Sequence, residues 1–65
     1  MHPSIEALLK YFEYSHLPVH LQEISRPFGE LARTLAERAP NNPETTAGIR
    51  KLLEAKDCAV RAALP

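Results

Sequence analysis

The stretch APNNPE, residues 39–44, separates two long helical patterns. Asn42 is a favourable N-cap residue, because its side chain can accept a hydrogen bond from the first turn of a helix. Pro43 suits the first helical position, where its missing N–H has no helical partner to lose. The sequence therefore predicts a helix over 43–63. The short connection predicts that this helix packs antiparallel against the helix before it.

A continuous apolar stripe predicts the preceding helix, over 18–39. Its residues recur every three or four positions and are Leu17, Leu21, Ile24, Phe28, Leu31, Leu35 and Ala39. Pro18 suits the first turn of this helix. Pro27 removes a backbone donor from the helix interior and Gly29 weakens the helix, so a kink is expected there. Because the stripe keeps its phase across both residues, we expect one kinked helix rather than two.

A shorter helix is predicted near the N-terminus, over 4–14. Ser4 suits its N-cap position. The apolar residues that follow with helical spacing are Ile5, Leu8, Leu9 and Phe12. The helix should end near Tyr14 or Ser15, because the residue before Pro18 is pushed away from the α region. We expect this helix to fold across one end of the hairpin.

Oligomerisation is expected to complete a core that one chain is too small to build. The chain has 65 residues, and we expect a single helical-hairpin domain, 1–65. A domain of this size buries only about 60 % of its unfolded surface. Cys58 is the only cysteine, so no disulfide can form within the chain. The expected fold is all-α: a short N-terminal helix followed by a long antiparallel helical hairpin, completed by homo-oligomerisation.

The charge balance argues against a protein that binds duplex DNA. Lys and Arg number 8, Asp and Glu number 8, and the formal net charge is +0. Duplex DNA favours strongly basic proteins, whereas a small anionic ligand needs only a few local cations. No apolar stretch approaches the ~20 residues of a membrane span. No signal-peptide pattern is recognised either, so a cytoplasmic location is expected.

No set of residues predicts catalysis, a cofactor or a metal ion. No Ser or Cys has a placed base, and no glycine-rich phosphate loop is present. His16 and His20 have the spacing of helical metal ligands, but Pro18 lies between them and no third ligand is evident. Cys58 lies among alanines and is expected to be a small buried side chain. We therefore expect a protein that is not an enzyme.

Lys56 interrupts the apolar face of the predicted 43–63 helix. It falls near the middle of that face, where a charge is costly unless it is paired. Either its stem lies on apolar surface while its ammonium reaches water or a carboxylate, or it is a buried cation at a subunit interface or anion site. The neighbouring pairs Asp57–Arg61 and Arg50–Glu54 are expected to form i, i+4 ion pairs on the helix surface.

Three aromatic residues gather near the end of the N-terminal helix. Phe12 belongs to the apolar stripe, whereas Tyr11 and Tyr14 lie off its centre. These tyrosines are expected at the solvent surface or an interface, and an exposed ring is also suited to stack on a nucleobase. Arg26 stands beside the Pro27 kink. Its guanidinium is either a plain surface charge or a bidentate partner for phosphate.

Four motifs together resemble a known family of phage proteins. They are HLP (residues 16–18), SRPF (25–28), PETT (43–46) and EAKDCAVRA (54–62). In order and spacing, from about Tyr11 to Leu64, they resemble the anti-CBASS sponge of the second type. The helical hairpin of that family is shared with one class of anti-Thoeris sponge.

The resemblance implies a protein of immune evasion. Such sponges act in the host bacterial cytoplasm. They bind and sequester cyclic dinucleotides, such as 3′,3′-cyclic GMP-AMP, without cleaving them. They assemble as homohexamers, and the dinucleotide lies between two subunits. The stacking tyrosine and the basic residue before Pro-Phe match Tyr11 and Arg26, although the family more often has Lys at the second position. Some members bind cyclic trinucleotides at a separate site, for which Arg61 and Lys56 are the candidate cations.

Other functions fit parts of the sequence. A structural module for helical-hairpin oligomerisation or protein interaction explains the stripes, the neutrality and the size equally well. A small helix-turn-helix DNA binder is disfavoured by zero net charge and by a long antiparallel hairpin. A hydrolase of the same signals is disfavoured because no nucleophile, general base or metal set is visible.

Overall fold

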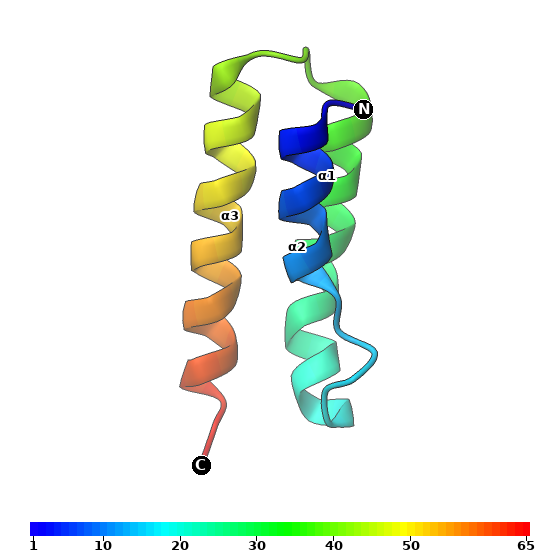
Figure 1. The fold of residues 1–65 in the computed structure, drawn as a ribbon. Coiled ribbons are helices and arrows are strands. Elements are labelled where there is room, and N and C mark those ends of the chain that lie inside the picture. The colour runs from blue at the N-terminus through cyan, green and yellow to red at the C-terminus, as the bar shows by residue number, and fades with distance from the viewer.

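The computed structural model describes every residue of the chain, Met1–Pro65. It contains three α-helices, α1 (Pro3–Leu9), α2 (Val19–Arg38) and α3 (Pro43–Ala62), and a 3₁₀ helix, η1 (Lys10–Phe12), that directly follows α1. α2 and α3 form an antiparallel hairpin, and α1 lies alongside it near the connecting loop (Figure 1). The prediction of an all-helical chain with a short first helix and two longer, packed helices is confirmed.

α1 begins and ends before the predicted 4–14 helix does. The N-cap residue is His2 rather than Ser4, since the His2 ring nitrogen Nδ1 accepts a hydrogen bond from the Ser4 N–H at 3.1 Å. Pro3 explains the shift, because proline is favoured at the first helical position. The α-helix then tightens into η1, and the chain becomes extended at Glu13 (φ −58°, ψ 137°).

α2 runs through Pro27 as one helix, as the phase of the apolar stripe predicted. It begins after Pro18, which is extended (φ −55°, ψ 151°) and stands at the N-cap position rather than in the first turn. Gln22 binds the preceding loop to the first turn of α2. Its Nε2 donates to the carbonyl oxygens of Leu17 at 2.7 Å and Ser15 at 3.3 Å.

The buried face of α2 differs from the predicted stripe. Leu31 belongs to that stripe but is 47 % exposed. The buried residues of the helix are Leu21, Ser25, Gly29 and Ala32. This face is made largely of small residues, and η1 packs closely on it: a Cβ at Gly29 would lie 3.3 Å from the Phe12 carbonyl oxygen. A pattern of large apolar residues does not reveal a face on which a neighbouring backbone lies so near.

The start of α3 agrees with the prediction. Asn42 is the N-cap residue, and its side-chain oxygen accepts a hydrogen bond from the Thr45 N–H at 3.1 Å. Pro43 occupies the first helical position. The Thr45 hydroxyl donates to the Pro40 carbonyl across the turn. α3 ends at Ala62, one residue before the predicted end.

The core lies in the half of the hairpin that α1 covers. Six buried residues from α1, η1, α2 and α3 form it: Ile5, Leu8, Leu9, Phe12, Ala32 and Ile49. The partly buried residues packed against them are Phe28, Leu35, Ala36, Leu52 and Leu53. α1 therefore lies along the hairpin near its loop and contacts both long helices (Figure 1).

Much apolar surface is exposed on the single chain. Only 9 of 65 residues are buried. The large apolar side chains at the surface are Met1, Tyr11, Val19, Leu31 and Leu64. The start of α2 and the end of α3 form the part of the hairpin that α1 does not reach (Figure 1). None of the helices combines the length and apolar character needed to cross a membrane.

Candidate functional site

η1 presents Tyr11 at the surface while it buries Phe12. Phe12 is 4 % exposed and belongs to the core, whereas Tyr11 is 66 % exposed. A 3₁₀ helix has three residues per turn, so adjacent side chains point about 120° apart. The tight turn after α1 thereby directs two neighbouring rings to different surroundings, as the position of Tyr11 off the apolar stripe suggested.

Two helices hold the backbone of η1. From α3, Lys56 Nζ donates to the Tyr11 carbonyl oxygen at 2.9 Å. From α2, Gly29 approaches so closely that a Cβ there would lie 3.3 Å from the Phe12 carbonyl oxygen. The Tyr11 carbonyl is therefore bound by α3, and the backbone of the next residue lies close against α2. The Tyr11 ring projects from a constrained backbone rather than from a free loop.

The Lys56 ammonium is bound by two groups of its own chain. Its side chain is 13 % exposed, and its ammonium lies 2.9 Å from Asp57 Oδ1. The same ammonium lies 2.9 Å from the Tyr11 carbonyl oxygen. Of the two expected arrangements, this is the one in which the ammonium reaches a carboxylate while the stem lies along the protein. As a candidate ligand for a cyclic trinucleotide, Lys56 therefore has an ammonium already engaged by two oxygen atoms.

Arg26 lies on the exposed surface of α2, directly before Pro27. Its guanidinium carbon is 5.5 Å from the centroid of the Tyr14 ring, within the range of a cation–π contact. No carboxylate forms a salt bridge with Arg26. Sequence reasoning placed Tyr14 only at the solvent surface or an interface. Its half-buried position beside Arg26 depends on the path of the loop before α2, which no local motif specifies.

Tyr14 contacts Arg26 and follows Tyr11 by three residues, and we name these three residues the Tyr11–Arg26 patch. Tyr11 and Tyr14 are three residues apart, so their Cα atoms are separated by at most about 11 Å. Arg26 in turn lies against Tyr14. No side-chain hydrogen bond or ion pair within the chain engages the Tyr11 ring or the Arg26 guanidinium. The Tyr11 ring and the Arg26 guanidinium are therefore each free to meet a ligand.

The ion pairs on α3 differ from those expected. Asp57 pairs with Lys56 rather than with Arg61, and Arg50 and Glu54 form no salt bridge. Both predicted i, i+4 pairs are therefore wrong. The Lys56 ammonium is held near Asp57 by its hydrogen bond to the Tyr11 carbonyl, so Asp57 pairs with Lys56. An exposed arginine such as Arg61 gains little from an ion pair in water.

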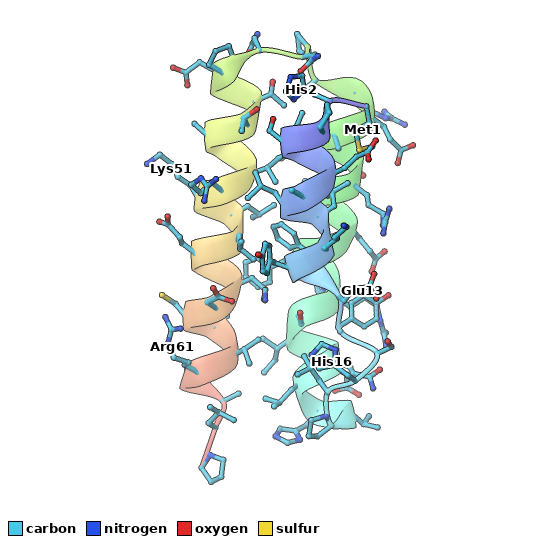
Figure 2. The ribbon with its side chains drawn as sticks, viewed as in Figure 1. Met1, His2, Glu13, His16, Lys51 and Arg61 are labelled. Atoms are coloured by element: carbon cyan, nitrogen blue, oxygen red, sulfur yellow. The ribbon has the colours of Figure 1, made fainter.

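Arg61 lies near the end of α3 and is exposed (Figure 2). Its Nη2 lies 3.6 Å from Cys58 Sγ, and Cys58 is exposed, so the predicted burial of Cys58 is wrong. Arg61 follows Lys56 by five residues, or about 7.5 Å along the helix axis. The structure does not bring Arg61 to a second aromatic residue or cation, and it stands as an isolated surface guanidinium.

No cluster of three His, Cys, Asp or Glu residues could hold a metal ion. His16 lies in the loop before α2 (Figure 2). His20 lies in the first turn of α2. The two imidazoles are thus not paired on one helix face, as the intervening Pro18 suggested.

A small hollow lies beside Tyr14, but neither Tyr11 nor Arg26 lines it. It has a volume of about 110 Å³ and is lined by Leu9, Phe12, Glu13, Tyr14, Gly29, Glu30 and Arg33. Small-molecule sites usually enclose roughly 300–1,000 Å³. A larger hollow of about 500 Å³ surrounds the connecting loop near Asn42 and Arg50 and includes no residue of the patch. A single chain therefore does not enclose a nucleotide at the Tyr11–Arg26 patch.

Comparison with protein-family models, curated proteins and solved structures finds no match to this chain. No relative supplies a ligand, an activity or an assembly for it. The motifs of the sequence and the side chains of the Tyr11–Arg26 patch are therefore the features that indicate a function.

Proposed function

We propose that this protein binds and sequesters cyclic dinucleotides of bacterial CBASS immunity without cleaving them, as the phage sponges it resembles do. The observation that carries the proposal is the Tyr11–Arg26 patch. It combines a ring that is 66 % exposed with a guanidinium that has no carboxylate partner. A base offers a flat face to the ring, and a phosphate offers two oxygens to the guanidinium.

A cyclic dinucleotide suits a pair of such patches. It has two bases, two phosphates and approximate two-fold symmetry, and an isologous dimer interface presents each side chain twice. Stacking contributes about 1–3 kcal/mol per base. Two stacked bases and two charge-assisted phosphate contacts are compatible with nanomolar affinity, about −12 kcal/mol, although such terms are not strictly additive.

Homo-oligomerisation is part of the proposal. The single chain leaves large apolar side chains exposed, among them Val19 at 70 % and Leu64 at 52 %. No hollow of the single chain is lined by Tyr11 or Arg26, so the proposal requires a second subunit to complete the site. The hexamer and the host bacterial cytoplasm follow from the resemblance alone. Arg26 in place of the family's more usual Lys keeps the charge and changes the geometry offered to phosphate.

A cyclic-trinucleotide site is a separate part of the proposal. Of its two candidate cations, Lys56 is engaged within the chain, whereas Arg61 is exposed and has no carboxylate partner. Arg61 is therefore the residue to test with cyclic tri-AMP. Loss of trinucleotide binding in Arg61→Ala, with dinucleotide binding retained, would support two separate sites.

Isothermal titration with 3′,3′-cyclic GMP-AMP tests the main proposal. We expect tight binding and recovery of intact nucleotide from the denatured complex. Tyr11→Ala and Arg26→Ala should each weaken binding by about tenfold or more, while light scattering shows an unchanged assembly. Arg50→Ala is the matched control, because it removes another exposed arginine without an ion pair. Cleaved nucleotide would instead indicate a hydrolase.

A structural oligomerisation module is the alternative function. Burial of only 9 of 65 residues favours it, since such a chain gains core by self-association whether or not it binds a ligand. It predicts a stable oligomer that binds neither cyclic GMP-AMP nor cyclic tri-AMP at micromolar concentration. A stable oligomer that binds neither nucleotide would refute the proposed sponge and support the structural oligomerisation module.

A further inference from the structure

Lys56 makes the one side-chain hydrogen bond that joins distant parts of the chain. Its Nζ reaches the Tyr11 carbonyl oxygen across 45 residues, whereas every other side-chain hydrogen bond spans at most seven. An apolar residue at this position would continue the apolar face of α3 without the desolvation cost of a charge. The ammonium therefore supplies a hydrogen bond to the Tyr11 carbonyl that an apolar side chain could not make.

The Tyr11 carbonyl has no other partner. It lies at the end of the helical segment formed by α1 and η1, where the last carbonyl groups lack intrahelical donors. No backbone N–H of the following loop donates to it. Lys56 supplies the missing donor, and Asp57 Oδ1 balances the charge at 2.9 Å from the same ammonium.

We propose that Lys56 is a positioning residue that holds η1 so that the Tyr11 ring stands ready to stack on a base. This inference rests on the proposed function. Lys56 contacts the backbone from which the ring projects and does not itself contact the nucleotide. A ring on a backbone that is already fixed loses less conformational freedom when it binds, so affinity rises without any new contact to the ligand.

A double-mutant cycle between residues 11 and 56 tests the proposal by calorimetry with 3′,3′-cyclic GMP-AMP. Lys56→Met keeps the length of the stem and removes the donor; it should weaken binding about tenfold. The same substitution in a Tyr11→Ala background should cause almost no further loss, and Lys56→Arg should restore most of the affinity. A tenfold loss that persists without the Tyr11 ring would overturn the proposal in favour of direct ligand contact or a general structural role.

A measurement without ligand separates this inference from the proposed function. We expect backbone ¹⁵N order parameters at Tyr11 and Phe12 to fall in Lys56→Met, from about 0.85 towards 0.6. Lys51→Met is the matched control, since Lys51 is an exposed lysine of α3 with no hydrogen bond to another element (Figure 2). If Lys56→Met does not fold, Lys56→Leu, which also lacks a donor, replaces it in both measurements.

The two failures give different results. If the wild-type protein binds no cyclic dinucleotide, the proposed function fails and the order parameters alone decide the structural half of the inference. If the protein binds but the order parameters at Tyr11 and Phe12 do not change in Lys56→Met, Lys56 does not hold η1 and the positioning role is overturned.

Discussion

Replacing Gly29 by alanine measures how firmly η1 is held. An added Cβ would lie 3.3 Å from the Phe12 carbonyl oxygen and 3.6 Å from Phe12 Cβ, so η1 would have to move by a few tenths of an ångström. That movement is resisted at two points. The Phe12 side chain is buried in the core, and the adjacent Tyr11 carbonyl is bound by Lys56.

The magnitude follows from two opposing effects. Gly→Ala within a helix ordinarily stabilises a protein by about 0.4–1 kcal/mol. Crowding in a well-packed region costs about 1–3 kcal/mol. We therefore expect Gly29→Ala to lower the free energy of unfolding by about 1 kcal/mol. Gly48→Ala, in α3, has nothing within 4 Å of its added Cβ and should raise that free energy by the ordinary helical gain.

Thermal unfolding followed by circular dichroism compares the two variants. For a chain of this size, 1 kcal/mol shifts Tm by about 4–8 °C. Both variants must be measured at one protomer concentration, because the Tm of an oligomer depends on concentration. Gly29→Ala should melt several degrees below the wild type and Gly48→Ala several degrees above it. If Gly29→Ala stabilised the protein as much as Gly48→Ala, η1 would not be firmly held. The inference that the Tyr11 ring projects from a constrained backbone would then be wrong.

Three further substitutions test the cap, the core and the patch. Asn42→Ala removes the acceptor for the Thr45 N–H and should lower the free energy of unfolding by about 1 kcal/mol in a urea titration; an unchanged midpoint would mean that the cap adds no stability. Ile49→Ala empties a fully buried core position and should cost about 2–5 kcal/mol in the same assay, whereas a loss well below that range would argue against packing of α1 on α3. Tyr14→Leu removes the ring beside the Arg26 guanidinium but keeps apolar bulk. It should weaken binding of 3′,3′-cyclic GMP-AMP about threefold with little change in Tm, and equal affinity in calorimetry would show that Arg26 needs no ring.

Helix boundaries were predictable where the chemistry is local. Asn42 and Pro43 set the start of α3 by a cap and a fixed φ, both within one turn of the chain. The same logic, applied to Ser4, missed a better local signal one residue earlier: Pro3 at the first helical position and the His2 ring nitrogen as its cap.

The buried face of α2 could not be predicted in the same way. Gly29 is buried because η1 lies directly against it, and Ala32 is buried in the core that the other helices share. Small side chains permit that approach. A sequence pattern gives weight to large apolar residues such as Leu31, which is exposed on the single chain. The contact between residues 11 and 56 is likewise set by the tertiary path and not by any spacing along one helix.

The candidate site was predictable in part. The position of Tyr11 off the apolar stripe indicated an exposed ring, and the structure places it at the surface. The contact between Arg26 and Tyr14 depends on a loop path that no motif describes. The predicted ion pair between Arg61 and Asp57 is wrong because Asp57 pairs with the ammonium of Lys56 instead.

The placement of α1 against α3 has a consequence for synthesis on the ribosome. Ile5 and Ile49 belong to one core, so α1 has no complete surface to pack on until α3 has been made. At about 5–20 residues per second, the chain between them takes roughly 2–9 s to be added. During that interval α2 is the only long helix on which α1 can pack, so the shared core is completed only after α3 has been synthesised.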